Sequence, residues 1–248
     1  MPAARRRPGR LVRNGLRRVA DGLFPRGANP HGVLPALLIL LAFVTGLVDA
    51  VSFLGLGRVF VANMTGNIVF LSFALAGEAQ MSRWASPAAL VSFGAGAWSA
   101  GRVIRRTANP RRAFAAATAV HALLVAATLA IALTAGHRTT WSQAALIVLL
   151  ACGMGLQNAS VRALGVPDLV TNVLTTTLTS LAADTPGRAA LRRSASIAAM
   201  FLGALTGALL HLTTGPAPAL AAALALLTTV ALVARSGLSR EGTPPAPG

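Results

Sequence analysis

Long apolar runs separated by clusters of arginine constrain this chain more than any other feature of its sequence. A helix needs about 20 apolar residues to cross the hydrocarbon core of a bilayer, and six runs in the 248 residues approach or reach that length. Runs this long do not suit a soluble domain of this size, so the sequence predicts an all-α, polytopic membrane protein. The six runs cover residues 34–56, 88–104, 114–135, 144–164, 196–212 and 219–234.

Two further apolar segments do not have the pattern of a simple membrane span. Residues 59–77 are long enough to cross, but they contain a polar cluster that includes Asn63 and Asn67. Residues 169–183 are too short and carry five threonines. Irregular backbone at membrane depth is tolerated only where it is buried in protein or lines a cavity. We therefore expect both to be broken or re-entrant segments.

The distribution of arginine indicates how these segments are oriented. All 22 basic residues are arginine, and six acids oppose them to give a net charge of +16. If all eight apolar segments crossed, 15 arginines would lie inside and 7 outside; if the two odd segments return on the side they enter, the split is 19 to 3. Since arginine is retained on the cytoplasmic side, the charge count favours six crossings with both termini in the cytoplasm.

The same charge indicates which partners to expect. Arginine beside long apolar runs is explained by attraction to anionic lipid head groups, so we expect the lipid bilayer and its anionic lipids as partners at the inner face. We expect no nucleic-acid partner, because the sequence contains no binding motif and no interleaving of aromatic and basic residues.

The two odd segments occupy matching places in an internal repeat. Gly46 corresponds to Gly155, and Asp49 corresponds to Asn158. Each half then continues with a glycine-containing helix and ends in a helix rich in alanine and leucine. Three crossings per half would invert the second half relative to the first, which is a common plan among transporters. The sequence thus predicts one membrane domain, residues 34–234, built from two inverted repeats at about 34–136 and 141–234.

Basic and polar tails flank this domain. The segment 1–33 carries eight arginines and lacks the apolar core of a signal peptide. Val12, Leu16, Val19 and Leu23 recur in it at helical spacing, which fits a short helix on an anionic membrane surface. A disordered, cytoplasmic tail that fixes the orientation is the alternative. Residues 235–248, which end in GTPPAPG, are predicted to be a disordered C-terminal tail.

Short motifs in both halves resemble the YoaK-type family of bacterial membrane proteins. They are GLVDAVSFL and VFVANMTGN in the first half, and GLQNASVRALG followed by TNVLTTTLT in the second. The resemblance covers roughly residues 34–234, and it departs from the family pattern at Thr175-Thr176, where the family has Thr-Gly. It implies about six spans and a place in the bacterial inner membrane. Because the family is defined as a domain of unknown function, the resemblance implies no substrate.

Asp49 is the only acid deep within a predicted span. An ionised carboxylate at the centre of a bilayer costs about 2.5–3.5 kcal/mol on insertion scales. The side chain must therefore face a cavity, find a partner or take up a proton. Its functional interpretation is a coupling site for a proton or cation, or an acceptor for a solute. Its structural interpretation is a hydrogen bond to Asn63, Asn67 or a backbone amide.

Neutral polar residues supply the other candidates for binding a solute or ion. Asn63, Thr65 and Asn67 can hydrogen-bond a solute, and Gly66 allows a turn or a close approach to the main chain. The alternative is a polar clamp between helices. If the halves are related by pseudo-symmetry, this set meets its counterparts at mid-membrane, and those counterparts are Gln157, Asn158, Thr171, Asn172 and Thr175.

The remaining signals are less specific. Arg162 lies near a span end, where it can extend to the inner surface, pair with Asp168 or bind an anion. Small residues suit close helix packing at Gly94, Gly203 and Gly207, and the GxxxG formed by the last two would also suit a homodimer. No enzyme motif and no metal-ligand spacing occurs in the sequence. We therefore expect neither an enzyme nor a cofactor or metal site.

These features favour a small-solute transporter of the secondary type. The solute would be small and polar, or a weak organic acid, and Asp49 would couple its movement to a proton. A passive channel or facilitator that uses the same polar cluster is the first alternative, and it would not accumulate solute against a gradient. A non-transporting membrane scaffold or sensor that acts through the basic tail is the second.

Overall fold

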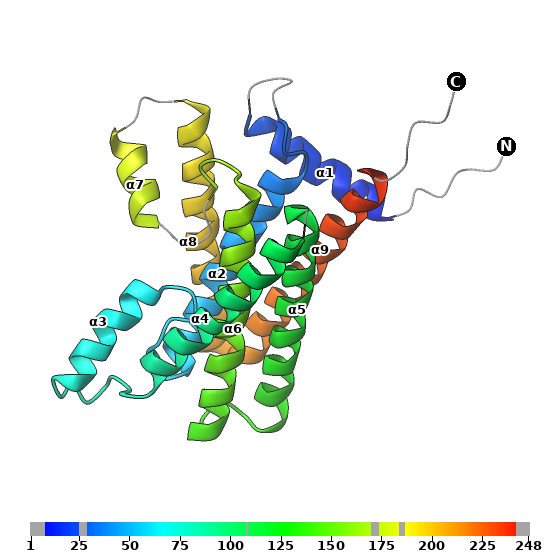
Figure 1. The fold of residues 1–248 in the computed structure, drawn as a ribbon. Helices are drawn as coiled ribbons and strands as arrows, with labels where there is room; N and C mark the ends of the chain where they lie inside the picture. Colours follow the sequence, from blue (N-terminus) through cyan, green and yellow to red (C-terminus); the bar gives the residue numbers. More distant parts are fainter. Residues whose placement is uncertain (1–7, 25–28, 108, 170–173, 184–186, 242–248) are drawn as a thin grey trace, which may run out of the picture.

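The computed structural model describes residues 8–24, 29–107, 109–169, 174–183 and 187–241 (Figure 1). The regular secondary structure within these ranges is entirely helical. In chain order the helices are α1 (Pro8–Gly22), α2 (Leu34–Gly55), α3 (Met64–Leu75), α4 (Ala85–Arg106), α5 (Pro110–Thr134), α6 (Thr140–Leu164), α7 (Leu174–Ala183), α8 (Arg188–Thr214) and α9 (Pro216–Glu241).

The lengths of these helices agree with the apolar runs. Five of them, α2, α5, α6, α8 and α9, are long and apolar enough to cross a membrane. Helix α4 is as long as α2, with 22 residues, but it is less apolar because it contains glycine, serine and arginine. Helices α3 and α7 have only 12 and 10 residues. The predicted fold class, an all-α membrane protein with long helices and two short segments, is confirmed.

Local sequence signals account for several helix ends. The side chain of Asn109 caps α5 by accepting a hydrogen bond of 2.9 Å from the backbone N–H of Arg111, and Pro110 follows it at the first helical position. Gly165 ends α6 with a left-handed φ of 61°. Helix α9 continues to Glu241, so residues 235–241 are helical and the predicted disordered tail is shorter than expected. The last turns of α9 contain arginine, and the helix dipole favours a positive charge at that end of a helix.

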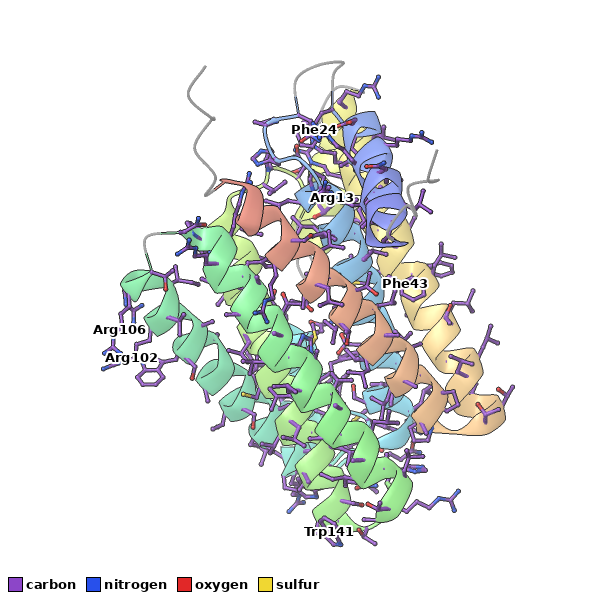
Figure 2. All side chains as sticks on the ribbon, turned by 90° about the vertical axis from the view of Figure 1, so that its right-hand side faces the viewer. Arg13, Phe24, Phe43, Arg102, Arg106 and Trp141 are labelled. Atoms are coloured by element: carbon purple, nitrogen blue, oxygen red, sulfur yellow. The ribbon has the colours of Figure 1, made fainter. Side chains whose placement is uncertain are left out.

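The long helices pack in pairs that repeat between the two halves (Figure 1). Helix α2 of the first half packs along α8 of the second, and α6 of the second half packs along α4 of the first. In the same way α5 packs on α6 and α9 packs on α2, while α5 and α9 contact each other. Helices α2 and α6 run in opposite directions (Figures 1 and 2). The two halves therefore form an inverted repeat.

Equivalent glycines bring these helix pairs into backbone contact. A side chain at Gly46 would overlap the carbonyl oxygen of Met200 in α8, and one at Gly155 would overlap the carbonyl oxygen of Phe93 in α4. Gly155 follows Gly46 by 109 positions, and Met200 follows Phe93 by 107. The two contacts are thus one contact repeated, which supports the alignment of Gly46 with Gly155.

The glycines that we predicted for helix packing differ in their surroundings. A side chain at Gly203 would overlap the carbonyl oxygen of Phe43 in α2, and Gly207 lies against Leu47 of the same helix. A side chain at Gly94, in contrast, would meet no described atom within 4 Å, which corrects the expectation for that position. Gly96, two positions later, lies against the backbone of Cys152 in α6 instead.

The two short helices lie beside the bundle and point toward its opposite ends. Helix α3 packs on α4, and α7 packs on α8. Figure 1 shows α3 at the lower left, near the C-terminal end of α2, and α7 at the upper left, near the start of α8. The two short helices are therefore related by the same inversion as the long ones.

Helix α1 lies across one end of the bundle. Leu23 and Phe24, which follow it, are buried. Arg188 and Arg192 at the start of α8 donate hydrogen bonds to the carbonyl oxygens of Gly22, at 2.7 Å, and Leu23, at 3.3 Å. Residues 8–22 thus form the amphipathic helix that was one of the two expectations for the basic segment, and residues 1–7 lie outside the described ranges.

Basic clusters that are distant in the sequence meet at this end of the bundle. His31, just before α2, lies near both Arg111 of α5 and Arg192 of α8. Burial together with these two positive charges lowers the pKa of His31. Figure 2 shows Arg13 and Phe24 at this end and Trp141 at the other. The arginine groups that the charge count assigned to one side of the membrane therefore share one end of the fold.

Candidate solute site

The chain doubles back into the bundle after α2. The buried carboxylate of Asp49 accepts hydrogen bonds through Oδ1 from the backbone N–H of Val61, at 2.9 Å, and of Ala62, at 2.8 Å. Asp49 lies six residues before the end of α2, which is about 9 Å along a helix axis. The segment before α3 therefore turns inward, and α3 then runs back out. This is the re-entrant path expected for residues 59–77.

Asn67 holds the same segment from the other side. Its Nδ2 donates to the carbonyl oxygen of Phe60 at 2.6 Å, and its Oδ1 accepts from the Phe60 N–H at 2.9 Å. The Asn67 side chain is fully buried. These two bonds satisfy the backbone N–H and carbonyl oxygen of Phe60, which lies outside the helices. In this conformation Asp49 performs the structural role that was left open for it, a hydrogen bond to backbone amides. Asn67 binds the backbone of its own segment at Phe60, so these bonds are not the clamp between two helices that was its alternative.

Asn63 and Gly66 form the beginning of α3. The side chain of Asn63 accepts a hydrogen bond of 3.3 Å from the Gly66 N–H and so caps the helix. A side chain at Gly66 would lie only 3.0 Å from the ring of Phe60. Gly66 therefore allows the inward loop to pack closely against the first turn of α3.

A cavity of about 640 Å³ lies between this first turn of α3 and the last turns of α6. The first repeat thus supplies one wall and the second repeat supplies the opposite wall. Asn63 and Thr65 line it from α3, and both are exposed, while the half-buried Asn158 lines it from α6. The complete described lining is Ala62, Asn63, Met64, Thr65, Phe93, Ala97, Asn158, Ala159, Val161, Arg162, Gly165, Val166 and Leu169.

The second-half candidates separate into three groups. Asn158 lies in the cavity wall, and its Nδ2 donates to the carbonyl oxygen of Met154 at 3.0 Å. Gln157 points elsewhere, because its Nε2 donates to Thr45 Oγ1 of α2 at 3.1 Å in the buried core. Outside the described residues lie Thr171 and Asn172. Thr175 belongs to α7, but the position of its side chain is not described.

Arg162 lines the cavity, although sequence reasoning did not include it in the site. Asp168, one of the alternatives considered for Arg162, instead pairs with Arg192 at 2.5 Å and with Arg193 at 2.7 Å. Asp168 has a left-handed φ of 61°, so the chain turns there and carries its carboxylate toward α8. The signal for Arg162 in the sequence was its place four residues after Asn158, on the same face of a helix.

Known proteins resemble this chain in sequence. Residues 37–233 match the family of proteins of unknown function designated DUF1275. The chain is also 35% identical over 154 residues to the UPF0700 transmembrane protein YoaK of Bacillus subtilis (strain 168), across 61% of this chain and 67% of that protein. No solved structure matches the chain. The resemblance inferred from the motifs is confirmed, and the family match spans both repeats. The protein belongs to the DUF1275 family and is a multi-pass membrane protein.

Proposed function

We propose that this protein is a small-solute transporter of the secondary type, located in the bacterial inner membrane. The observation that carries the proposal is the cavity between the two inverted repeats, which is lined by the first turn of the half-helix α3 and by Asn158 of α6. Inverted-repeat transporters bind their solutes at such repeat interfaces, beside discontinuous helices. A cavity of about 640 Å³ also falls in the size range of small-molecule sites.

Asp49 supplies a route for coupling to a proton. The carboxylate forms no ion pair with any described residue, and it holds Val61 and Ala62 beside the cavity. Hydrogen bonds to a charged group are worth about 1.5–3 kcal/mol and neutral ones about 0.5–1.5 kcal/mol. Protonation of Asp49 therefore loosens the inward loop, so the proton and the shape of the solute site depend on each other.

Basic residues at one end of the fold support a cytoplasmic position for that end. It collects α1 and the starts of α2, α5 and α8, with Arg111 and Arg192 both near His31. Arginine is enriched at the cytoplasmic face of membrane proteins. Both termini lie on that side in the proposed orientation.

Reconstitution tests the transport proposal. Proteoliposomes with an inward proton gradient are incubated with a mixture of small metabolites, and the retained solutes are measured by mass spectrometry. We expect the wild type to accumulate at least one solute above its external concentration and Asn158→Ala to reduce that accumulation. Ser72→Ala, on the exposed part of α3 outside the cavity lining, serves as the matched control.

Two other results would contradict the proposal of a secondary transporter. Equilibration of a solute without uphill accumulation indicates a passive facilitator. The absence of any solute difference between protein-containing and protein-free liposomes contradicts transport altogether. Asp49→Asn then separates coupling from binding, since we expect it to remove the dependence of uptake on the proton gradient.

A further inference from the structure

The charge of the described cavity lining is positive. Arg162 is its only charged side chain, and no acid lines the cavity among the described residues. A cation that faces a shaped cavity attracts anions, and this attraction grows as the effective dielectric constant around the charges falls. The lining therefore discriminates by charge as well as by shape.

Within the described ranges, no acidic side chain lies in position to neutralise Arg162. It forms no hydrogen bond or ion pair through its side chain with the described part of the chain. The nearest acid in the sequence, Asp168, is already held by Arg192 and Arg193. The guanidinium can therefore offer its paired N–H donors to a ligand, in the geometry that suits a carboxylate.

The wall opposite Arg162 also favours negative charge. Met64 and Thr65 form the first turn of α3, and their backbone N–H groups make no hydrogen bond to the described residues. The positive end of the helix dipole adds to these donors. The amide groups of Asn63 and Asn158 supply neutral donors beside them.

The rest of the lining is apolar. Phe93 of α4 lines the cavity, together with Val166 and Leu169 beyond α6. A ligand that fits both parts has one negatively charged head and an apolar body. A single cation suits a single negative charge, and the volume of about 640 Å³ admits a molecule of several to a dozen heavy atoms.

We infer that the cavity binds small organic monocarboxylates, with Arg162 as the counter-charge and the first turn of α3 as the second donor group. This inference rests on the proposed function in that it names the class of solute. Arg162 is the residue that selects anions over neutral solutes of the same size.

The test uses the full-length protein in nanodiscs of phosphatidylcholine, with radiolabelled benzoate as the probe and benzamide as its uncharged counterpart. We expect saturable benzoate binding. The affinity for benzamide should be lower by about tenfold or more, since the hydrogen bonds to a charged carboxylate are lost. Arg162→Gln should lower benzoate affinity about tenfold or more, and Arg162→Lys should restore part of it. Arg106→Gln, which removes an exposed arginine outside the cavity lining, should leave the affinity unchanged.

A second arm distinguishes a free solute from a lipid head group. Short-chain phosphatidylglycerol is added as a soluble competitor, and the titration is repeated in nanodiscs that contain phosphatidylglycerol. A solute site keeps its benzoate affinity in both membranes. Displacement of benzoate by the lipid, with the lipid bound through Arg162, would overturn the inference and assign the arginine to a head group.

Three further results also count against the anion site: equal binding of benzamide and benzoate, unchanged affinity in Arg162→Gln, or no saturable binding of benzoate, hexanoate and lactate to the wild type. Its failure is distinct from that of the transport proposal. If benzoate binds through Arg162 but the reconstituted protein moves no solute, the anion site stands and transport fails. If only neutral solutes accumulate and Arg162→Gln does not change their uptake, transport stands and the anion site fails.

Discussion

The carboxylate of Asp49 accepts a hydrogen bond of 2.8 Å from the backbone N–H of Ala62, which lies 13 positions further along the chain. Ala62 in turn lines the cavity between the two repeats. The one acid buried in the bundle of described helices therefore sets the position of a wall of the candidate site. This relationship ties the ionisation of a single side chain to the geometry of a cavity that it does not itself line.

Replacement of Asp49 by Asn removes the charge and keeps the shape of the side chain. We expect the hydrogen bonds to Val61 and Ala62 to weaken by roughly 1–3 kcal/mol in total, because neutral acceptors bind less strongly than charged ones. Hydrogen exchange measured by mass spectrometry on the peptide before α3 should be faster than in the wild type. Glu78→Gln, which changes an exposed acid, is the control, and equal exchange in Asp49→Asn and the wild type would be inconsistent with this role.

Asn67→Leu removes both hydrogen bonds to Phe60. The backbone N–H and carbonyl oxygen of Phe60 would lose their partners, at a cost of about 1–3 kcal/mol for each unsatisfied group. We expect a lower midpoint of thermal unfolding for the detergent-solubilised protein. Thr65→Ala, two residues earlier and exposed, should leave the midpoint unchanged. Similar midpoints for Asn67→Leu and Thr65→Ala would argue against the clamp.

The repeated glycine contacts predict matched effects in the two halves. Gly46→Ala and Gly155→Ala should each destabilise the protein by about 1–3 kcal/mol, because the added methyl group meets backbone that cannot move aside. Gly94→Ala should be neutral or slightly stabilising, since its methyl group meets open space and alanine favours helix. Thermal unfolding of the three variants measures this, and a loss at Gly94 as large as at Gly46 would refute the assignment.

Cysteine labelling in whole cells tests the orientation. In a Cys152→Ser background, Arg106→Cys and Arg188→Cys should both be shielded from a membrane-impermeant maleimide, whereas Arg138→Cys should react. Arg188 is chosen because it is exposed, while Arg192 is buried against Asp168. Reaction of Arg106→Cys from outside the cell would instead support eight crossings.

His31 predicts a dependence of stability on pH. Its pKa in the folded protein lies below the ordinary value of about 6.5, so the unfolded chain takes up the proton first as the pH falls. The stability that neutral His31 contributes is therefore present above about pH 6.5 and is lost as the pH falls toward the lower, folded-state pKa. The melting temperature should drop less between pH 7.5 and 5.5 in His31→Gln than in the wild type; equal drops would exclude this contribution.

The sequence alone determined the class of the fold and its plan. The length of an apolar run measured against the thickness of a bilayer identifies a long helix, and polar interruptions identify the two short ones, because both properties are local to a segment. The place of Gly46, Asp49 and the following polar segment in one half, and of Gly155 and Asn158 in the other, indicated the repeat. The positions of arginine indicated which helix ends share a side.

Only the tertiary structure decided which of the candidate residues meet. Gly94 and Gly96 differ by two positions, which is about 200° around a helix, so the rotation of α4 against α6 selects Gly96. Asn158 and Gln157 are neighbours in the sequence, yet one lines the cavity and the other bonds Thr45 in the core. Asp168 pairs with Arg192 and Arg193, whereas Arg162 lines the cavity. Apolar length and charge are properties of one segment, whereas partners depend on the rotation and depth of every helix, which are set only when the helices pack together.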